Sequence, residues 1–164
     1  MEIWEVLDKD RIKTGKTIVR GTPMQPDEYH LVVDIWIRNS DGDYLITKRT
    51  PNKSFPNMWT ICGGSAVLGD GSFETALKEV KEEIGIDLTK DKGRLIKSFR
   101  RDTSKIRCFK DVYLFEEDVD LKDVVHQVDE VSDSMWASES KIYDMIDTGE
   151  FINVLSYLGD VFKY

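Results

Sequence analysis

The chain has 164 residues, of which 40% are hydrophobic and 33% charged, a composition typical of one soluble globular domain. Its formal net charge of −8 argues against nonspecific binding to nucleic acid or to an anionic membrane. No run approaches the ~18 apolar residues that a membrane span needs, and the acidic first residues predict no secretory signal. The two cysteines, Cys62 and Cys108, form no disulfide framework and lack zinc-site spacing, which favours a cytoplasmic location.

The first third of the chain alternates strand patterns with turn signals. Five segments are expected to be strands: residues 2–8, 16–21, 29–39, 44–49 and 58–64. The first two belong to an N-terminal extension over residues 1–28. An Asp-Gly turn at 40–43 predicts a hairpin between the next two strands. Pro51 and Pro56 then break the chain into a loop before the fifth strand, which ends in glycines.

An amphipathic helix is predicted over residues 72–84. Its apolar residues recur at helical spacing and form one face: Phe73, Ala76, Leu77, Val80 and Ile84. Gly71 or Ser72 can cap its N-terminus, and Gly85 is a natural C-terminal stop.

The second half of the chain predicts two more strands, at 93–102 and 106–118, joined as a hairpin. A final strand is expected at 129–138. Residues 138–162 read as one broken helix or two short helices, with Ser138 as a cap. Strands at both ends, with helices between and after them, indicate an α/β sandwich with a mixed sheet.

Three glutamates, Glu79, Glu82 and Glu83, lie close together on the predicted helix. Like charges three or four residues apart on a helix repel one another, so their grouping needs a reason. The three carboxylates can point to one edge of the sheet, beside a glycine-rich loop whose carbonyls add further ligands, and Mg²⁺ and Mn²⁺ prefer such oxygens. The alternative is an ordinary solvated helix face, in which Lys78 pairs with Glu82.

The stretch from Gly64 to Ile86 resembles the Nudix box. In that pattern a glycine is followed after five residues by Glu, and after seven more by Arg-Glu-apolar-any-Glu-Glu-any-Gly-apolar. Seven of the nine specified positions match, whereas Asp70 stands in place of Glu and Lys78 in place of Arg. The resemblance implies a Nudix-type α/β/α sandwich with a mixed β-sheet, in which residues 1–164 form a single domain and residues 64–86 the box.

The resemblance also implies a Mg²⁺- or Mn²⁺-dependent hydrolase that cleaves a pyrophosphate bond in a nucleoside diphosphate derivative. By family correspondence Glu79 and Glu83 are the main metal ligands, Glu82 shares that role, and the Gly64 carbonyl is a further ligand. The catalytic base is one of the box glutamates or an acid from a distant loop. Glu130 is a candidate for the latter, with a solvated loop acid as its alternative.

Several cations could hold the phosphates of a small-molecule pyrophosphate. Arg49, at the end of the 44–49 strand, is the best bidentate phosphate clamp among them. Four more surround the later hairpin as substrate cations or as solvated surface charges: Arg100, Arg101, Lys105 and Arg107. Trp59 and Phe55 could stack on a base, although core packing is the alternative for Trp59.

The whole chain is also similar to the Nudix branch that contains isopentenyl diphosphate isomerase. His30 and Cys62 fall where that enzyme has a metal-binding histidine and its catalytic cysteine. The isomerase has a Gly-His pair after its cysteine, whereas Gly63 and Gly64 follow Cys62 here. Pro23 stands in place of a second histidine, and the catalytic acid would fall near Asp111. Isomerase-like activity and a non-catalytic nucleotide-binding module are therefore the alternative functions.

Apolar surface on the N-terminal strands and in residues 153–162 could support a homodimer.

Overall fold

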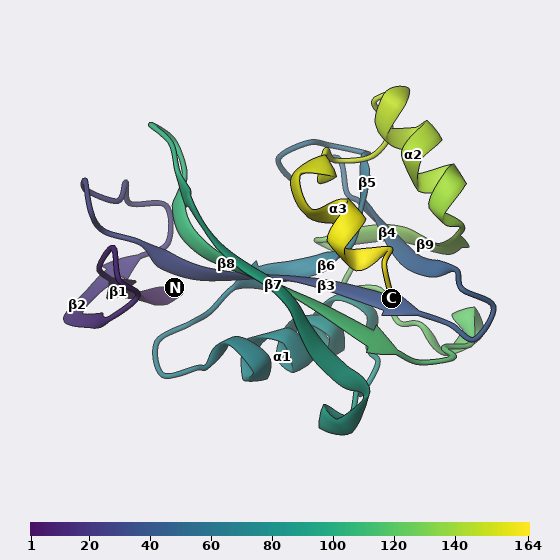
Figure 1. Cartoon of the computed structure of the whole chain (residues 1–164), viewed down its shortest axis with the longest axis horizontal. Helices are drawn as coiled ribbons and strands as arrows, with labels where there is room; N and C mark the ends of the chain where they lie inside the picture. The colour runs from purple at the N-terminus through teal and green to yellow at the C-terminus, as the bar shows by residue number, and fades with distance from the viewer.

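A mixed seven-stranded sheet is the centre of the computed structural model, which describes residues 1–164 (Figure 1). Its strands are β3 (His30–Arg38), β4 (Tyr44–Arg49), β5 (Trp59–Thr60), β6 (Cys62–Ser65), β7 (Gly93–Asp102), β8 (Arg107–Glu116) and β9 (Val131–Ala137). The central strand β3 runs parallel to β8 and antiparallel to β4 and β6. Strand β7 extends the sheet beyond β8, and β9 pairs with β4.

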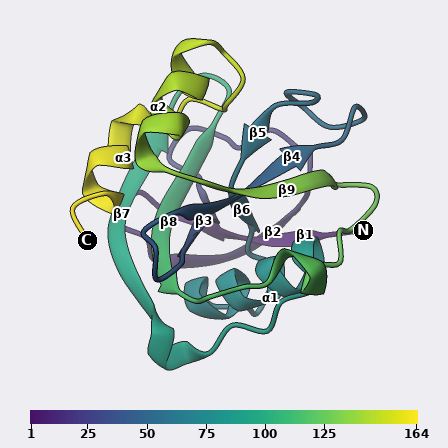
Figure 2. The same cartoon turned by 90° about the vertical axis from the view of Figure 1, so that its right-hand side faces the viewer.

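Helices cover both faces of this sheet (Figures 1 and 2). Helix α1 (Ser72–Ile84) covers one face, and the short helices α2 (Glu139–Asp147) and α3 (Leu155–Val161) cover the other. Each face has its own core: Val80 and Ile84 pack among residues such as Ile35 on the α1 side, whereas Leu158 packs near Trp36 on the other. The expected α/β/α sandwich with a mixed sheet is therefore confirmed.

Helix α1 has the predicted bounds. Gly71 is its N-cap, and the Glu74 carboxylate accepts a hydrogen bond from the Gly71 N–H at 3.0 Å, which satisfies a backbone donor at the helix start. Gly85 ends the helix in a left-handed conformation, with φ of 75°. The helix is thereby fixed at both ends, and the acidic positions keep a defined orientation relative to the sheet.

A separate two-stranded hairpin, β1 (Ile3–Leu7) and β2 (Lys13–Val19), lies at one end of the molecule (Figure 1). Leu7 exchanges backbone hydrogen bonds with Tyr29, and both side chains pack on Phe109. At the turn of the hairpin, Arg11 adopts a φ of 66° and pairs with Asp111 of β8, a carboxylate whose residue is only 1% exposed. The hairpin is thus anchored to the main sheet by packing and by an ion pair.

Two details differ from the sequence-based expectation. Strand β2 begins three residues earlier than predicted, and the segment at 58–64 forms two strands rather than one. The second difference arises because the chain changes partner at Ile61: β5 pairs with β4, whereas β6 pairs with β3. The C-terminal segment forms two separate helices, which is one of the two predicted arrangements. None of the helices has the length and hydrophobicity that a membrane span requires.

Candidate active site

The carboxylate of Glu79 lies directly against Gly64, at the point where β6 meets the loop before α1. A methyl group on Gly64 would come within 2.1 Å of Glu79 Oε1, so only glycine leaves room for this carboxylate. Burial raises the pKa of Glu79 to about 7, and the negative charges of Glu82 and Glu130 act in the same direction. This carboxylate is therefore held near other acids and against the backbone of Gly64.

Glu83, one helical turn later, is more deeply buried, with 7% of the residue exposed. Burial raises its pKa to about 8, and the charge of Glu79 adds to the shift, while hydrogen bonds from the Cys62 thiol and the Gly63 N–H oppose it. Glu79 and Glu83 thus form a mutually repelling pair. Glu82 is exposed beside them, and the three glutamates do not converge on one point as a preformed cluster.

The lysines of helix α1 do not neutralise this pair. Lys78 contacts both carboxylate oxygens of Asp70, and Lys81 pairs with Asp87 at 2.6 Å. The alternative in which Lys78 pairs with Glu82 is therefore not what the structure shows. A half-buried and a buried carboxylate without a basic partner, beside the backbone of Gly64, have the donor chemistry that a hard divalent cation requires.

Glu130, on the loop before β9, faces the same region from another element. Its charge contributes to the raised pKa values of both Glu79 and Glu83. Lys53 forms an ion pair with it at 2.6 Å, and the Glu130 carbonyl accepts a hydrogen bond from the Thr50 N–H at 3.1 Å. The loop after β4 and the loop before β9 therefore bring a fourth carboxylate and a lysine to the box glutamates.

A cavity of about 760 Å³, here called the basic cavity, lies on the face of the sheet opposite α1. The strand register explains its position, because His30 and Val32 of β3 are paired with Cys108 and Lys110 of β8, and side chains alternate between faces. Its basic lining residues are Arg49, Arg101, Lys105, Arg107 and Lys110, and no aspartate or glutamate lines it. A chain of net charge −8 thus gathers positive charge at one place.

The basic cavity and the box glutamates are neighbours around the edge of β6. Ser65 lines the cavity, and the adjacent Gly64 contacts Glu79 on the other side of the sheet. Arg20 connects the two regions electrostatically, since its charge lowers the pKa of both Glu79 and His30. An elongated anion could therefore contact both.

Arg49 lines the basic cavity, and it also organises the loop after β4. Its Nε donates to the Ser54 carbonyl at 2.6 Å, and a second guanidinium nitrogen donates to Ser54 Oγ at 3.1 Å. No carboxylate is paired with it in the structure, so its charge is available to an anion. Arg101, Lys105 and Arg107 also line the cavity, whereas Arg100 does not.

The predicted aromatic candidates lie outside this cavity. Trp59 packs against the core on the α2–α3 side, and Phe55 is 60% exposed on the loop after β4. The aromatic residue in the cavity lining is instead Trp4, which sequence reasoning missed together with Lys110. Neither has a local signal, because each reaches the cavity through strand pairing between distant segments.

The residues that resemble the isomerase are not arranged as a catalytic pair. His30 is stacked on Trp4 with ring centroids 4.2 Å apart, and its Nδ1 lies 3.1 Å from the Arg107 carbonyl oxygen. Cys62 is buried on the α1 side, where burial and the charge of Glu83 raise the pKa of its thiol. Asp111 is paired with Arg11 and accepts a hydrogen bond from Ser72.

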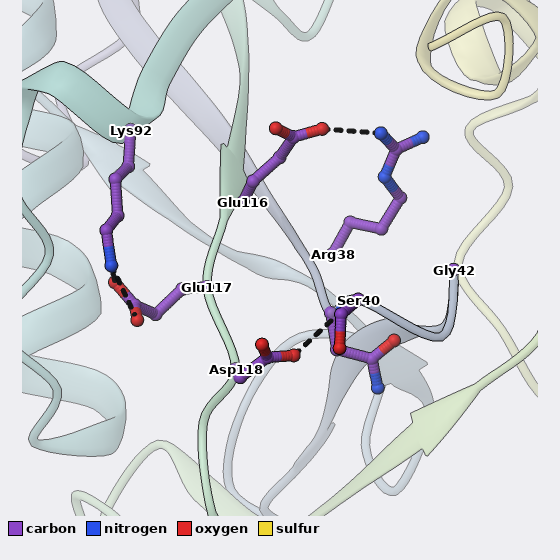
Figure 3. Close-up of a pocket in the computed structure, with 8 residues that line it drawn as sticks. Arg38, Ser40, Gly42, Lys92, Glu116, Glu117 and Asp118 are labelled. Atoms are coloured by element: carbon purple, nitrogen blue, oxygen red, sulfur yellow. Dashed lines mark hydrogen bonds and ion pairs between the residues drawn. The ribbon is translucent and has the colours of Figure 1, made fainter.

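A second cavity, of about 390 Å³, lies at the far ends of β3 and β8 (Figure 3). Its three acids all have partners: Glu116 contacts Arg38, Glu117 contacts Lys92 and Asp118 accepts from the Ser40 N–H. Two of its three acids are thus neutralised by cations and the third accepts a backbone hydrogen bond, in contrast to the unpaired cations of the basic cavity.

Comparison with known proteins places these features in context. The model of the NUDIX domain family matches residues 28–153. The chain is 37% identical over 167 residues to an uncharacterised Nudix hydrolase of Listeria innocua, covering 99% of this chain and 95% of that protein. It is 25% identical over 147 residues to isopentenyl-diphosphate Delta-isomerase of Escherichia coli, covering 76% and 80%. A crystal structure of DR0079 from Deinococcus radiodurans has the same fold, with a TM-score of 0.76, 22% identity and coverage of 99% and 98%.

Proposed function

The chain belongs to the Nudix family and is a pyrophosphohydrolase, and we propose that it cleaves a nucleoside diphosphate derivative in a reaction that depends on Mg²⁺ or Mn²⁺. The observation that carries this proposal is the unneutralised pair of the half-buried Glu79 and the buried Glu83 beside Gly64. Two such carboxylates are costly unless a cation accompanies them. The family and the local chemistry therefore support the same function.

In this proposal Glu79, Glu83 and the Gly64 carbonyl hold the cation, and the exposed Glu82 contributes directly or through water. Bound there, a divalent cation polarises the phosphoryl oxygens and lowers the pKa of a coordinated water. The mutual repulsion of Glu79 and Glu83 keeps the site selective for cations, and burial limits competition from bulk water.

Glu130 is the proposed general base, with the box glutamates as the alternative. It lies on an element that does not carry the cation ligands, and its ion pair with Lys53 fixes its orientation. Arg49 is proposed to bind the substrate phosphates at the β4 end of the basic cavity, since it lines the cavity and lacks a carboxylate partner. Its bonds to Ser54 hold the guanidinium in place before the substrate arrives.

Isomerase-like activity is less well supported. A catalytic thiolate would have to form at Cys62, whose thiol pKa is raised by burial and by the charge of Glu83. The acid at the corresponding position, Asp111, is tied into an ion pair with Arg11. A non-catalytic binding module would have no use for the repelling carboxylates of the box.

The test is phosphate release from a panel of nucleoside diphosphate derivatives, coupled to a phosphatase and assayed with and without Mg²⁺. We expect Mg²⁺-dependent turnover that Glu83→Gln abolishes and Cys62→Ala leaves in place. Rearrangement of isopentenyl diphosphate, with no hydrolysis of the panel, would favour the isomerase. Binding of a panel member without turnover would favour the binding module.

A further inference from the structure

We propose that the outer end of the basic cavity, formed by Arg101 and Lys105 on the β7–β8 hairpin, is a second anion subsite. It would take a phosphate group of the substrate that is additional to the two phosphates of the scissile anhydride. The inference rests on the proposed hydrolase function and names its substrate class: a pyrophosphate that carries a further phosphate group.

The first support is the balance of charge in the basic cavity. Of its five cations, Lys110 is neutralised by Asp34 at 2.7 Å and Arg107 by Asp102 at 3.2 Å. The remaining three, Arg49, Arg101 and Lys105, form no ion pair. A diphosphate diester accompanied by a divalent cation is close to neutral and does not need all three of them. The surplus therefore calls for more negative charge in the ligand.

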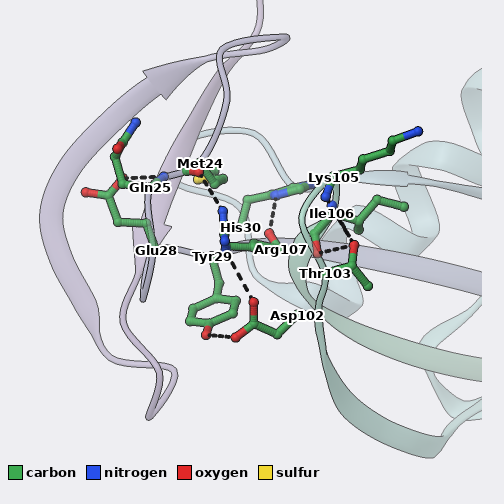
Figure 4. Close-up of polar contacts among 10 residues, drawn as sticks. All are labelled: Met24, Gln25, Glu28, Tyr29, His30, Asp102, Thr103, Lys105, Ile106 and Arg107. Atoms are coloured by element: carbon green, nitrogen blue, oxygen red, sulfur yellow. Dashed lines mark hydrogen bonds and ion pairs between the residues drawn. The ribbon is translucent and has the colours of Figure 1, made fainter.

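The second support is the fixed frame beneath these charges (Figure 4). Asp102 bridges Tyr29, whose hydroxyl donates to it at 2.6 Å, and Arg107. Arg107 in turn donates to the Met24 carbonyl at 3.0 Å, which ties the hairpin to the segment before β3. These contacts hold the backbone on both sides of the β7–β8 turn, which follows Arg101 and carries Lys105, before a ligand binds.

Lys105 occupies a turn that is closed by Thr103. The Thr103 hydroxyl accepts from the Lys105 N–H at 3.3 Å and from the Ile106 N–H at 2.9 Å. The Lys105 ammonium end extends away from the other labelled side chains (Figure 4). A lysine on a constrained turn with a free ammonium group suits the recognition of a phosphate that approaches from solvent.

The third support is that the aromatic rings of the cavity are already engaged with each other on one face. Trp4 and His30 are stacked on each other with an interplanar angle of 6°, so each covers one face of its partner. The two predicted stacking residues, Trp59 and Phe55, do not line the cavity. Recognition by charge is consequently better provided for than recognition by stacking on a base.

The experiment compares matched substrates that differ by one phosphate, namely NADP⁺ with NAD⁺ and coenzyme A with dephospho-coenzyme A. For the wild type we expect the member with the additional phosphate, in at least one pair, to have a kcat/KM about tenfold higher than its partner. A factor of about ten corresponds to the free energy of one charge-assisted hydrogen bond. Arg101→Ala with Lys105→Ala should abolish this preference. The matched control, Lys90→Ala with Arg94→Ala, removes the same charge at the other end of β7 and should retain it.

A binding measurement separates this inference from the hydrolase proposal. Calorimetry without divalent cations should show adenosine 2′,5′-bisphosphate binding more tightly than AMP, and the Arg101/Lys105 double variant should lose the difference. The conservative exchange Arg101→Lys with Lys105→Arg keeps both positive charges and should retain the preference for the bisphosphate. Retention would show that the loss in the alanine variant comes from the missing charge and not from misfolding. Turnover without any phosphate preference would overturn the subsite and leave the hydrolase intact. A binding preference without turnover of any pyrophosphate would support the subsite and overturn the hydrolase.

Discussion

The ammonium group of Lys78 lies 2.7 Å from each carboxylate oxygen of Asp70. These are the two positions at which the box differs from the Nudix pattern, and they are each other's partners. A lysine cannot make the two-nitrogen bidentate contact with a carboxylate that an arginine at this position would make. In the structure Lys78 instead joins the loop before α1 to the helix, so its first effect is on the loop that leads from Gly64 to Gly71.

Removing either partner should lower activity through this loop. We expect Lys78→Ala and Asp70→Asn each to reduce kcat/KM severalfold. The double variant should lose no more than the more impaired of the two single variants, since both changes break the same contact. A double-mutant cycle on kcat/KM tests this. Fully additive losses would mean that the two residues act separately. Lys81→Ala, which breaks contacts with Asp87 and the Gly85 carbonyl at the other end of α1, serves as the control.

Adjacent glycines should respond differently to the same substitution. In Gly64→Ala the new methyl group meets the Glu79 carboxylate at 2.1 Å, so the carboxylate must move, and we expect kcat/KM to fall by about 100-fold or more while the fold remains. In Gly63→Ala the new methyl group meets the Val33 carbonyl oxygen at 2.5 Å. This oxygen belongs to the backbone of the central strand, so we expect the free energy of unfolding to fall by about 1–3 kcal/mol. Urea unfolding and steady-state kinetics on both variants give the comparison. Equal losses of stability would contradict the assigned contacts.

The buried glutamates should make the metal-free protein less stable as the pH rises. Glu83 has a pKa of about 8 in the folded state and an ordinary value of 4.5, so between these values the folded state holds the proton that the unfolded state has lost. The free energy of unfolding therefore falls as the pH rises through this window, and the stability difference attributable to Glu83 is on the order of 2–4 kcal/mol.

Glu83→Gln removes this titration. The variant should be more stable than the wild type at pH 9, equal to it near pH 4, and inactive at any pH. Saturating Mg²⁺ should stabilise the wild type most at high pH, where the carboxylates are ionised, and should not stabilise the variant to the same extent. Urea titrations of both proteins from pH 4 to pH 9, with EDTA or with Mg²⁺, measure these differences. A wild type whose stability is flat across the range would refute the assignment.

His30 should act in the opposite direction at lower pH. Burial lowers its pKa from 6.5 to about 4, so between these values the unfolded state binds a proton that the folded state does not. Stability should fall by on the order of 2–3 kcal/mol as the pH drops from 6.5 to 4. His30→Gln should remove this pH dependence, whereas His126→Gln should leave it in place. Both variants keep Glu83, so the difference between their thermal unfolding profiles reports the contribution of His30 alone. Identical pH profiles for both variants would contradict the prediction.

Local patterns in the sequence predicted much of this protein. Helix α1 has the predicted bounds because its apolar spacing, Gly71 and Gly85 act within a few residues of one another. The box positions from Gly64 to Ile86 were recognisable for the same reason, as was the order of strands and helices. The division of the 58–64 segment into β5 and β6 was not predicted, because it depends on which neighbouring strand each half pairs with.

Tertiary structure decided where the charges lie. Lys78 and Glu82 are a possible helical pair in the sequence, but the loop places Asp70 within reach of Lys78 and leaves the glutamates without a lysine. Arg49 at the end of β4 and four cations within residues 101–110 of the β7–β8 hairpin line one cavity of a chain whose net charge is −8, because both segments lie beside β3 in the sheet. The sequence by itself determined the acidic helix α1 and the reaction class of the family, since both are encoded over a short range. The positive cavity depends on contacts between residues far apart in the chain, so only the folded sheet could reveal it.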